Sequence, residues 1–165
     1  MNYPATFKVE TRGDFDIVIE RTFNAPRKLV FEAHTRCDLL KRWLFGPDGW
    51  ELAVCEIDLR VGGKYRYVWR HATKKEMGMG GEFREIAPPG RLVSTERFDE
   101  AWYTGEALDI MELTESGGKT KLVLTVRYQS REARDMAAKS GMETGMAAGY
   151  DRLDVIFAEH AASAS

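Results

Sequence analysis

One histidine and four carboxyl groups have the types that acid–base chemistry uses, and all lie in segments predicted to be strands: His71, Glu56, Asp58, Glu82 and Asp109. A general acid or base must point into a pocket that shifts its pKa toward the working pH. Alternation places His71 on one strand face with Tyr67 and Trp69, toward one end of any cavity there. The alternative is a solvated side chain at the strand end. We therefore assign no catalytic residue and keep His71 as a candidate only.

Other catalytic chemistries lack the residues they need. His34 lies on a predicted short helix and His160 near the C-terminal end, so the three histidines form no metal-ligand cluster. The sequence has no Gly-x-Ser-x-Gly elbow, phosphate-binding loop or dinucleotide glycine pattern. We therefore expect no metal and no cofactor, and we favour a protein that is not an enzyme.

A second set of side chains suits an apolar ligand. Glycines recur every fourth residue at Gly141, Gly145 and Gly149, within a segment of helical spacing. A glycine inside a helix costs about 0.5–1 kcal/mol relative to alanine, so these glycines should leave room for a ligand or admit another backbone. The alternative is that Gly141 only ends a helix and that the neighbouring methionines are ordinary core. The predicted ligand-binding residues are Trp43, Tyr65, Tyr67, Trp69, Met79, Phe83, Met111, Met142, Met146 and Tyr150.

Hydrophobic periodicity predicts the elements that position these residues. A strand is expected over 15–23, with 6–11 extending or preceding it. Asn24 before Pro26 should cap the start of a helix, and Asp38 should cap a second short helix over 38–43. Alternation then predicts strands at 52–59, 64–71, 77–86, 91–98, 105–115 and 119–128. A helix over 131–140, capped by Ser130, precedes the long final helix.

This order predicts an α+β fold. The economical arrangement is a curved antiparallel sheet wrapped around the long C-terminal helix, with two short helices after the first strand. Such a fold leaves a space between sheet and helix. We expect an N-terminal extension or extra strand over 1–13, a single domain over 14–160 and a C-terminal tail over 161–165.

Composition limits the class of partner. The chain of 165 residues has 24 basic and 26 acidic residues in an interspersed pattern, which argues against nucleic acid or an anionic membrane. No run of apolar residues is long enough to span a bilayer, and the first residues lack the pattern of a signal peptide. We therefore expect a soluble cytoplasmic protein in which Cys37 and Cys55 are reduced thiols.

Four segments carry a family resemblance: Phe23-Asn24-Ala25-Pro26, 55–65, 81–93 and 141–153. In this order they resemble the START-like (SRPBCC) superfamily and, more narrowly, its branch named after the activator of the heat-shock protein 90 ATPase. The resemblance runs from about Asp14 to Glu159. It implies a helix-grip fold with an internal cavity, which members of the superfamily use for lipids, hormones, polyketides or other apolar molecules. It brings no catalytic motif that can be transferred residue by residue.

The residues and the resemblance together predict a soluble module that encloses a small apolar or amphipathic molecule. One alternative is a cyclase- or hydrolase-like cavity enzyme that uses His71 with a carboxylate. Another is a chaperone-linked protein-interaction module, although the eukaryotic activator has a separate chaperone-binding domain for which this chain has no room before Asp14. A protein partner and a homodimer stay open, and neither nucleic acid nor a membrane is expected.

Overall fold

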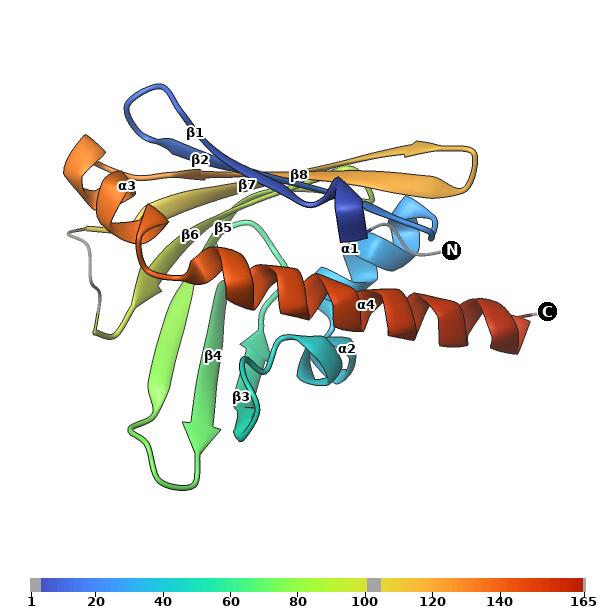
Figure 1. Ribbon diagram of the computed structural model, residues 1–165, viewed down its shortest axis with the longest axis horizontal. Helices are drawn as coiled ribbons and strands as arrows, with labels where there is room; N and C mark the ends of the chain where they lie inside the picture. The colour runs from blue at the N-terminus through green and yellow to red at the C-terminus, as the bar shows by residue number, and fades with distance from the viewer. Residues whose placement is uncertain (1–3, 101–104, 165) are drawn as a thin grey trace.

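One antiparallel sheet forms the body of the structure, a computed structural model that describes residues 4–100 and 105–164 (Figure 1). In these ranges the sheet has eight strands, in the spatial order β1-β2-β8-β7-β6-β5-β4-β3. They are β1 (Lys8–Arg12), β2 (Asp16–Phe23), β3 (Trp50–Ile57), β4 (Lys64–His71), β5 (Met77–Ala87), β6 (Arg91–Phe98), β7 (Ala107–Ser116) and β8 (Lys119–Arg127). The strands at 64–71 and 91–98 have their predicted bounds. Residues 8–12 form a separate edge strand paired with β2.

The helices cover one face of this sheet. They are the 3-10 turn η1 (Pro4–Thr6) and the α-helices α1 (Arg27–Thr35), α2 (Cys37–Trp43), α3 (Arg131–Ala138) and α4 (Met142–Ala164). Figure 1 shows α4 crossing the curved sheet, with α1 and α2 on the same side. This arrangement confirms the predicted α+β helix-grip fold. No helix in the described part of the chain is long and apolar enough to cross a membrane.

Two of the three predicted helix caps are wrong. Ser130 caps α3 as expected, since its hydroxyl accepts the amide of Ala133 at 3.0 Å. Asn24 does not cap α1, because the first amide of that helix, on Arg27, donates at 2.8 Å to a carboxylate of β7, Glu115. Asp38 lies inside the first turn of α2 and pairs with the preceding arginine. The folded chain supplies an acceptor from a distant strand, which no local pattern can indicate.

A buried ion pair fixes α4 against the sheet. Arg21 of β2 points toward the helix and is 1% exposed. Its guanidinium bonds to the carboxylate of Asp154 and reaches Asp151 at 3.2 Å. Tyr150, Leu153, Ile156 and Phe157 are buried on the same helix face. Separating the two partners would leave a buried charge uncompensated. The pair therefore helps to fix the position of α4 on the sheet.

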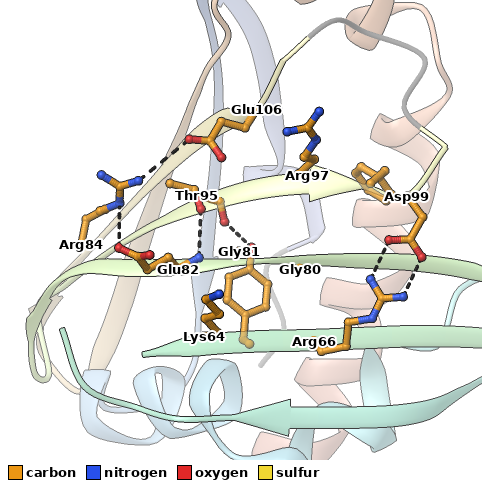
Figure 2. Close-up of a pocket in the computed structure, with 12 residues that line it drawn as sticks. Lys64, Arg66, Gly80, Gly81, Glu82, Arg84, Thr95, Arg97, Asp99 and Glu106 are labelled. Atoms are coloured by element: carbon orange, nitrogen blue, oxygen red, sulfur yellow. Dashed lines mark hydrogen bonds and ion pairs between the residues drawn. The ribbon is translucent and has the colours of Figure 1, made fainter. Parts of the chain in front are cut away.

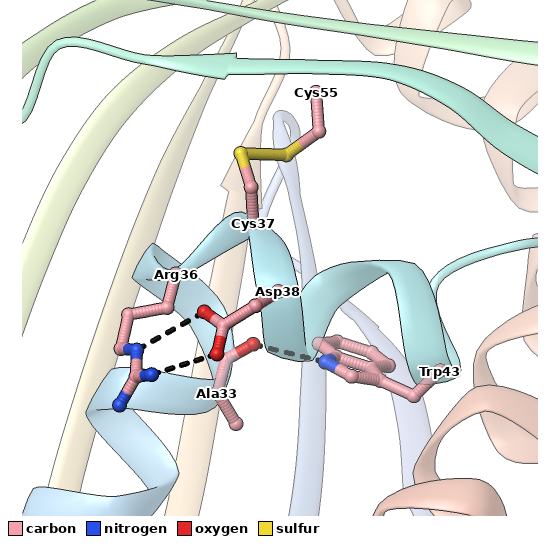
Figure 3. Close-up of a disulfide and its surroundings, with 6 residues drawn as sticks. All are labelled: Ala33, Arg36, Cys37, Asp38, Trp43 and Cys55. Atoms are coloured by element: carbon pink, nitrogen blue, oxygen red, sulfur yellow. Dashed lines mark hydrogen bonds and ion pairs between the residues drawn. A yellow bond between two sulfur atoms is a disulfide. The ribbon is translucent and has the colours of Figure 1, made fainter.

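The two cysteines are bonded to each other, contrary to the expectation of reduced thiols. Figure 3 shows the disulfide joining Cys37, the first residue of α2, to Cys55 of β3. Their Cα atoms are 5.7 Å apart although 18 positions separate them in sequence. The pairing depends on how α2 packs on the edge strand. The spacing of the cysteines alone therefore gave no signal for it.

Candidate functional site

The sheet face toward α4, called the inner face below, is defined by the strand register. Residues directly opposite one another on antiparallel strands share a face. Tyr67 lies opposite both Cys55 and Met79, and Met111 lies opposite both Leu92 and Leu124. Aromatic, methionine and aliphatic side chains from six strands therefore meet on the inner face.

The structure gathers all ten predicted ligand-binding residues in or against one hydrophobic cluster. Seven of them are buried: Trp43, Tyr65, Tyr67, Met79, Phe83, Met111 and Tyr150. The other three are half-buried and pack against that cluster: Trp69, Met142 and Met146. These positions fit a ligand-lining role and a core role alike, so their function depends on what lies beside them.

Ring contacts divide the aromatic members into two groups. On the sheet, the Tyr65 ring lies 5.1 Å from that of Tyr67 and 5.5 Å from that of Phe83, between ring centroids. Across the helices, the rings of Trp43 and Tyr150 stack at 6.1 Å. The indole nitrogen of Trp43 donates to the backbone oxygen of Ala33 at 2.9 Å, as Figure 3 shows. Each group is rigid, because its rings restrain one another.

Asp109 brings a polar group to the inner face. It alternates along β7 with Ala107 and Met111, and it lies opposite Ser94 of β6 and Val126 of β8. Its Oδ1 is buried and has no hydrogen-bond partner among the described residues. Buried polar atoms are rarely left without a partner, because the lost hydration is not replaced. Among the carboxyl groups that the sequence offered as acid–base candidates, Asp109 is therefore the one with a buried oxygen that lacks a partner.

The electrostatics of Asp109 follow from this position. Burial raises the pKa of its carboxyl group well above the usual range, and the negative charge of Glu96 together with a hydrogen bond to Glu96 raises it further. Glu96 lies opposite Ala107 in the register and thus on the inner face. Repulsion between two neighbouring negative charges disfavours ionisation of both carboxyl groups, so the pair retains a proton more readily than either group alone.

The charge of Asp109 acts on four tyrosines, which stay neutral. Burial is the main cause that raises the pKa of Tyr65, Tyr67, Tyr128 and Tyr150, and the charge of Asp109 raises all four further. The Tyr65 hydroxyl donates to the backbone oxygen of Thr95 at 2.5 Å. The interior thus contains neutral hydrogen-bonding groups in apolar surroundings. This chemistry suits recognition of a ligand.

The remaining acid–base candidates lie away from this cluster. Glu56 and Asp58 are exposed, and Glu82 lies on the outer face. His71 packs across the strand pair on Trp50, with ring centroids 5.2 Å apart, and its Nδ1 accepts the amide of Thr73 at 3.1 Å. Within 4–100 and 105–164 no carboxylate is hydrogen-bonded to His71. The pairing of His71 with a carboxylate, which the enzyme alternative required, is therefore not formed among these residues.

The glycines of the last helix have different surroundings. Gly141 has a positive φ of 86° and lies between α3 and α4, so it serves as a turn between two helices. Gly145 is exposed, and a Cβ there would meet no atom within 4 Å, so it does not border the interior. Gly149 is buried, and a Cβ there would lie 3.4 Å from the Trp43 ring. Helical periodicity placed the glycines on one flank but could not tell which faced α2.

Several residues on the inner face and on α4 keep accessible surface although their neighbours are buried. Trp69, Phe98, Asp109, Leu124, Met142 and Met146 are all half-buried. On α4 the change is gradual, because Met142 and Met146 are half-buried whereas Leu153 and Phe157 are at most 3% exposed. The first turns of α4 are thus less closely packed on the sheet than the middle of the helix.

A groove of about 470 Å³ lies elsewhere, over the outer sides of β4, β5 and β6. Figure 2 shows its charged side chains, with Arg66 held by both carboxylate oxygens of Asp99 at 2.6 Å. Arg84 lies within 4 Å of both Glu82 and Glu106. Most of these charges neutralise one another at an exposed surface, where each ion pair contributes little. Tyr65 and Phe98 also border this groove, whereas Asp109 does not.

Sequence reasoning missed three inner-face residues around Asp109: Ser94, Glu96 and Tyr128. The signal existed, since alternation along 91–98 places Ser94 and Glu96 on the face of Leu92. What alternation could not supply was the register between β6 and β7 that brings them beside Asp109. Among the described residues, no group of three His, Cys, Asp or Glu side chains could hold a metal ion.

One protein family and several solved structures are similar to this chain. The family model described as "Activator of Hsp90 ATPase homolog 1-like protein" matches residues 24–158. A search of curated proteins gave no match. Among solved structures, a Rhodobacter sphaeroides protein is 32% identical with a TM-score of 0.87, over 93% of this chain and 99% of that one.

More distant structures show the same fold. A Nitrosomonas europaea protein is 21% identical with a TM-score of 0.79, over 92% of this chain and 99% of the other. A Rhizobium loti protein is 26% identical with a TM-score of 0.67, over 90% of this chain and 98% of the other.

Proposed function

The chain belongs to the family of Activator of Hsp90 ATPase homolog 1-like proteins, and from this premise we propose that it binds a small apolar or amphipathic molecule between the inner face and α4. Proteins of this fold family often bind hydrophobic ligands. The fold gives such a molecule two apolar walls, one from the sheet and one from the helix.

The observation that carries the proposal is the accessible surface left on the inner face. Asp109 on β7 and Leu124 on β8 belong to neighbouring strands, and each is half-buried. A well-packed interior leaves few voids, so residual exposure at successive strands supports a space beside them. A molecule that filled this space would remove the remaining apolar surface from water.

The chemistry of the walls fits an adaptable binding site. Met111 lines the sheet side, while Met142 and Met146 line the helix side. Thioether side chains are flexible and polarisable, and they can repack around ligands of different shape. Tyr65, Tyr67 and Phe83 add rigid ring surfaces. Burial of apolar ligand surface stabilises a complex by roughly 25 cal/mol per Å² before the costs of association are subtracted.

Entry is expected at the N-terminal half of α4. Met142 and Met146 are half-buried there, and the helix follows the turn at Gly141. The middle of the helix is fixed by the Arg21–Asp154 ion pair and by the buried Phe157. A small outward movement of the first turns of α4 would open the space without breaking that ion pair.

A dye titration tests the proposal directly. Nile red, a neutral dye whose emission changes in apolar surroundings, should bind the folded protein at one site. Met146→Trp and Leu124→Trp each place a larger ring in the space and should weaken dye binding about tenfold or more by steric exclusion. The matched control is Met136→Trp on α3, where the methionine is 46% exposed. This control should bind the dye like the unaltered protein.

Two results would contradict the proposal. One is a folded protein that binds no dye. The other is a dye whose affinity falls equally in Met136→Trp and Met146→Trp, since binding would then depend on the outer surface. His71→Ala should leave dye affinity within a few-fold, because the His71 ring packs on Trp50. Each variant is compared only after its circular dichroism spectrum matches that of the unaltered chain.

A further inference from the structure

We propose that Asp109 binds the polar end of the ligand and that this ligand ends in a neutral hydrogen-bond donor, an alcohol, phenol or N–H group. The inference rests on the proposed function, because it takes the space between the inner face and α4 as the binding site. It adds the chemical class of molecule that the site selects.

The first argument is the missing partner of Asp109. Oδ1 is buried, and no donor reaches it within the described ranges. A carboxyl oxygen on an inner strand loses its water when the chain folds, and here no protein group replaces that water. A ligand that donates a hydrogen bond to Oδ1 would satisfy the atom and gain a directional contact inside an apolar site.

The second argument concerns the other oxygen of the same group. The carboxyl groups of Asp109 and Glu96 are hydrogen-bonded to each other, which requires a proton between them. With one oxygen engaged in that bond, Oδ1 is left as an acceptor. It therefore selects donors rather than acceptors. An ether or ester oxygen placed against Oδ1 could not form a hydrogen bond, because both oxygens are acceptors.

The third argument is the charge around the site. Ser94 of β6 lies opposite Asp109, Glu96 of β6 raises its pKa, and the charge of Asp109 in turn raises the pKa of four tyrosines: Tyr65, Tyr67, Tyr128 and Tyr150. No lysine is among them. Arg21 acts on Tyr150, but its guanidinium is bound to Asp154 and Asp151.

An anionic ligand would therefore place its charge beside two carboxyl groups, and none of the groups just named is a cation that could balance it. A cationic amine would need Asp109 ionised, and burial together with Glu96 opposes ionisation. Neutral donors avoid both costs.

A series of naphthalene probes separates these classes. The four probes share one ring system and differ in the group attached to it. Naphthalene has no polar group, 2-methoxynaphthalene has a hydrogen-bond acceptor, 2-naphthol has a neutral donor and 2-naphthoate has an anionic group. Their affinities are measured by isothermal titration calorimetry at pH 7. We expect 2-naphthol to bind about tenfold tighter than 2-methoxynaphthalene, the difference that one well-placed hydrogen bond to a buried acceptor gives. The anion should bind more weakly than naphthalene.

Variants of Asp109 assign the preference to this residue. Asp109→Leu replaces the carboxyl group with an apolar one of similar size and should make 2-naphthol and 2-methoxynaphthalene bind within about twofold of each other. Asp109→Asn keeps an oxygen acceptor and turns its amide toward Glu96, so the preference should persist. The matched control is Glu112→Leu, which removes an exposed carboxyl group from the outer face of the same strand. It should leave the tenfold ratio unchanged.

The outcomes distinguish the inference from the function on which it rests. If naphthalene binds but 2-naphthol gains nothing, or 2-naphthoate binds tightest, the proposed function stands and the role of Asp109 is wrong. If the preference survives Asp109→Leu, or disappears in Glu112→Leu, the role of Asp109 is again wrong. If none of the four probes binds the folded protein, both proposals fail. Should Asp109→Leu not fold, loss of the preference in the folded Asp109→Asn variant would overturn the inference.

Discussion

Gly149 of α4 lies against the indole ring of Trp43, and a methyl group added at this glycine would approach the ring carbon Cε3 to 3.4 Å. The carbonyl oxygen of Trp43 would be 3.6 Å away. The long helix therefore carries a glycine where the last residue of α2 lies against it. The contact positions the end of α2, and with it the stacked pair of Trp43 and Tyr150.

We expect Gly149→Leu to destabilise the fold. The larger side chain would overpack the contact with Trp43, and this costs about 1–3 kcal/mol after any gain in helix propensity. The free energy of unfolding is measured by urea denaturation followed by circular dichroism.

Gly145→Leu is the matched control, one helical turn earlier. A Cβ at Gly145 meets nothing within 4 Å, so the substitution should stabilise the helix by up to about 1 kcal/mol. It should also leave ligand affinity unchanged, because Gly145 is exposed. A large loss of stability in Gly145→Leu with none in Gly149→Leu would contradict this assignment.

The buried ion pair between Arg21 and Asp154 predicts strong coupling. Arg21→Met should lower the free energy of unfolding by about 3–5 kcal/mol, since it leaves a carboxylate that is only 3% exposed without its partner. The double variant Arg21→Met with Asp154→Leu should recover most of this loss, because two packed apolar groups replace the pair. Additive effects in the double-mutant cycle would show that the two side chains do not depend on each other.

His34 predicts a loss of stability in acid. Burial lowers the pKa of its imidazole to about 4, while the Nδ1 hydrogen bond to the oxygen of Val30 at 2.8 Å has the opposite, smaller effect. Below the usual value of about 6.5 the unfolded chain takes up a proton that the folded chain resists. The stabilising contribution is thus complete above pH 6.5 and is lost as the pH falls toward 4, by about 3 kcal/mol in all.

Denaturation curves between pH 4 and 8 test this loss. His34→Gln should remove that part of the pH dependence, whereas His160→Gln on the exposed end of α4 should retain it. Identical pH profiles for His34→Gln and the unaltered protein would show that the His34 imidazole does not stay neutral in the folded state.

The elements could be predicted from the sequence because their signals are local. Period-two alternation fixed the strands at 64–71 and 91–98, and the polar Ser130 marked the start of α3. The features that failed are non-local. The partner of the first amide of α1 comes from Glu115, 88 positions away, and the disulfide depends on α2 lying on β3.

The candidate site shows the same division. Inward-facing residues such as Tyr67 and Met111 follow from alternation, so the apolar lining could be predicted. Asp109 was one of several carboxyl groups on strands, and His71 ranked above it because alternation places His71 on the strand face of Tyr67 and Trp69. Only the register of β7 with β6 places Asp109 beside Glu96 in the interior.

The central claim, that a molecule binds between the inner face and α4, is tested most directly by methyl NMR of methionine. The chain is labelled with ¹³C at the methionine methyl groups and titrated with 2-naphthol. Met79, Met111, Met142 and Met146 lie in or against the core on both walls of the proposed site, and Met136 on α3 serves as an internal control. The account predicts saturable shifts of the four wall signals with the Met136 signal unchanged. Shifts confined to Met136, or no shift at saturating probe, would contradict it.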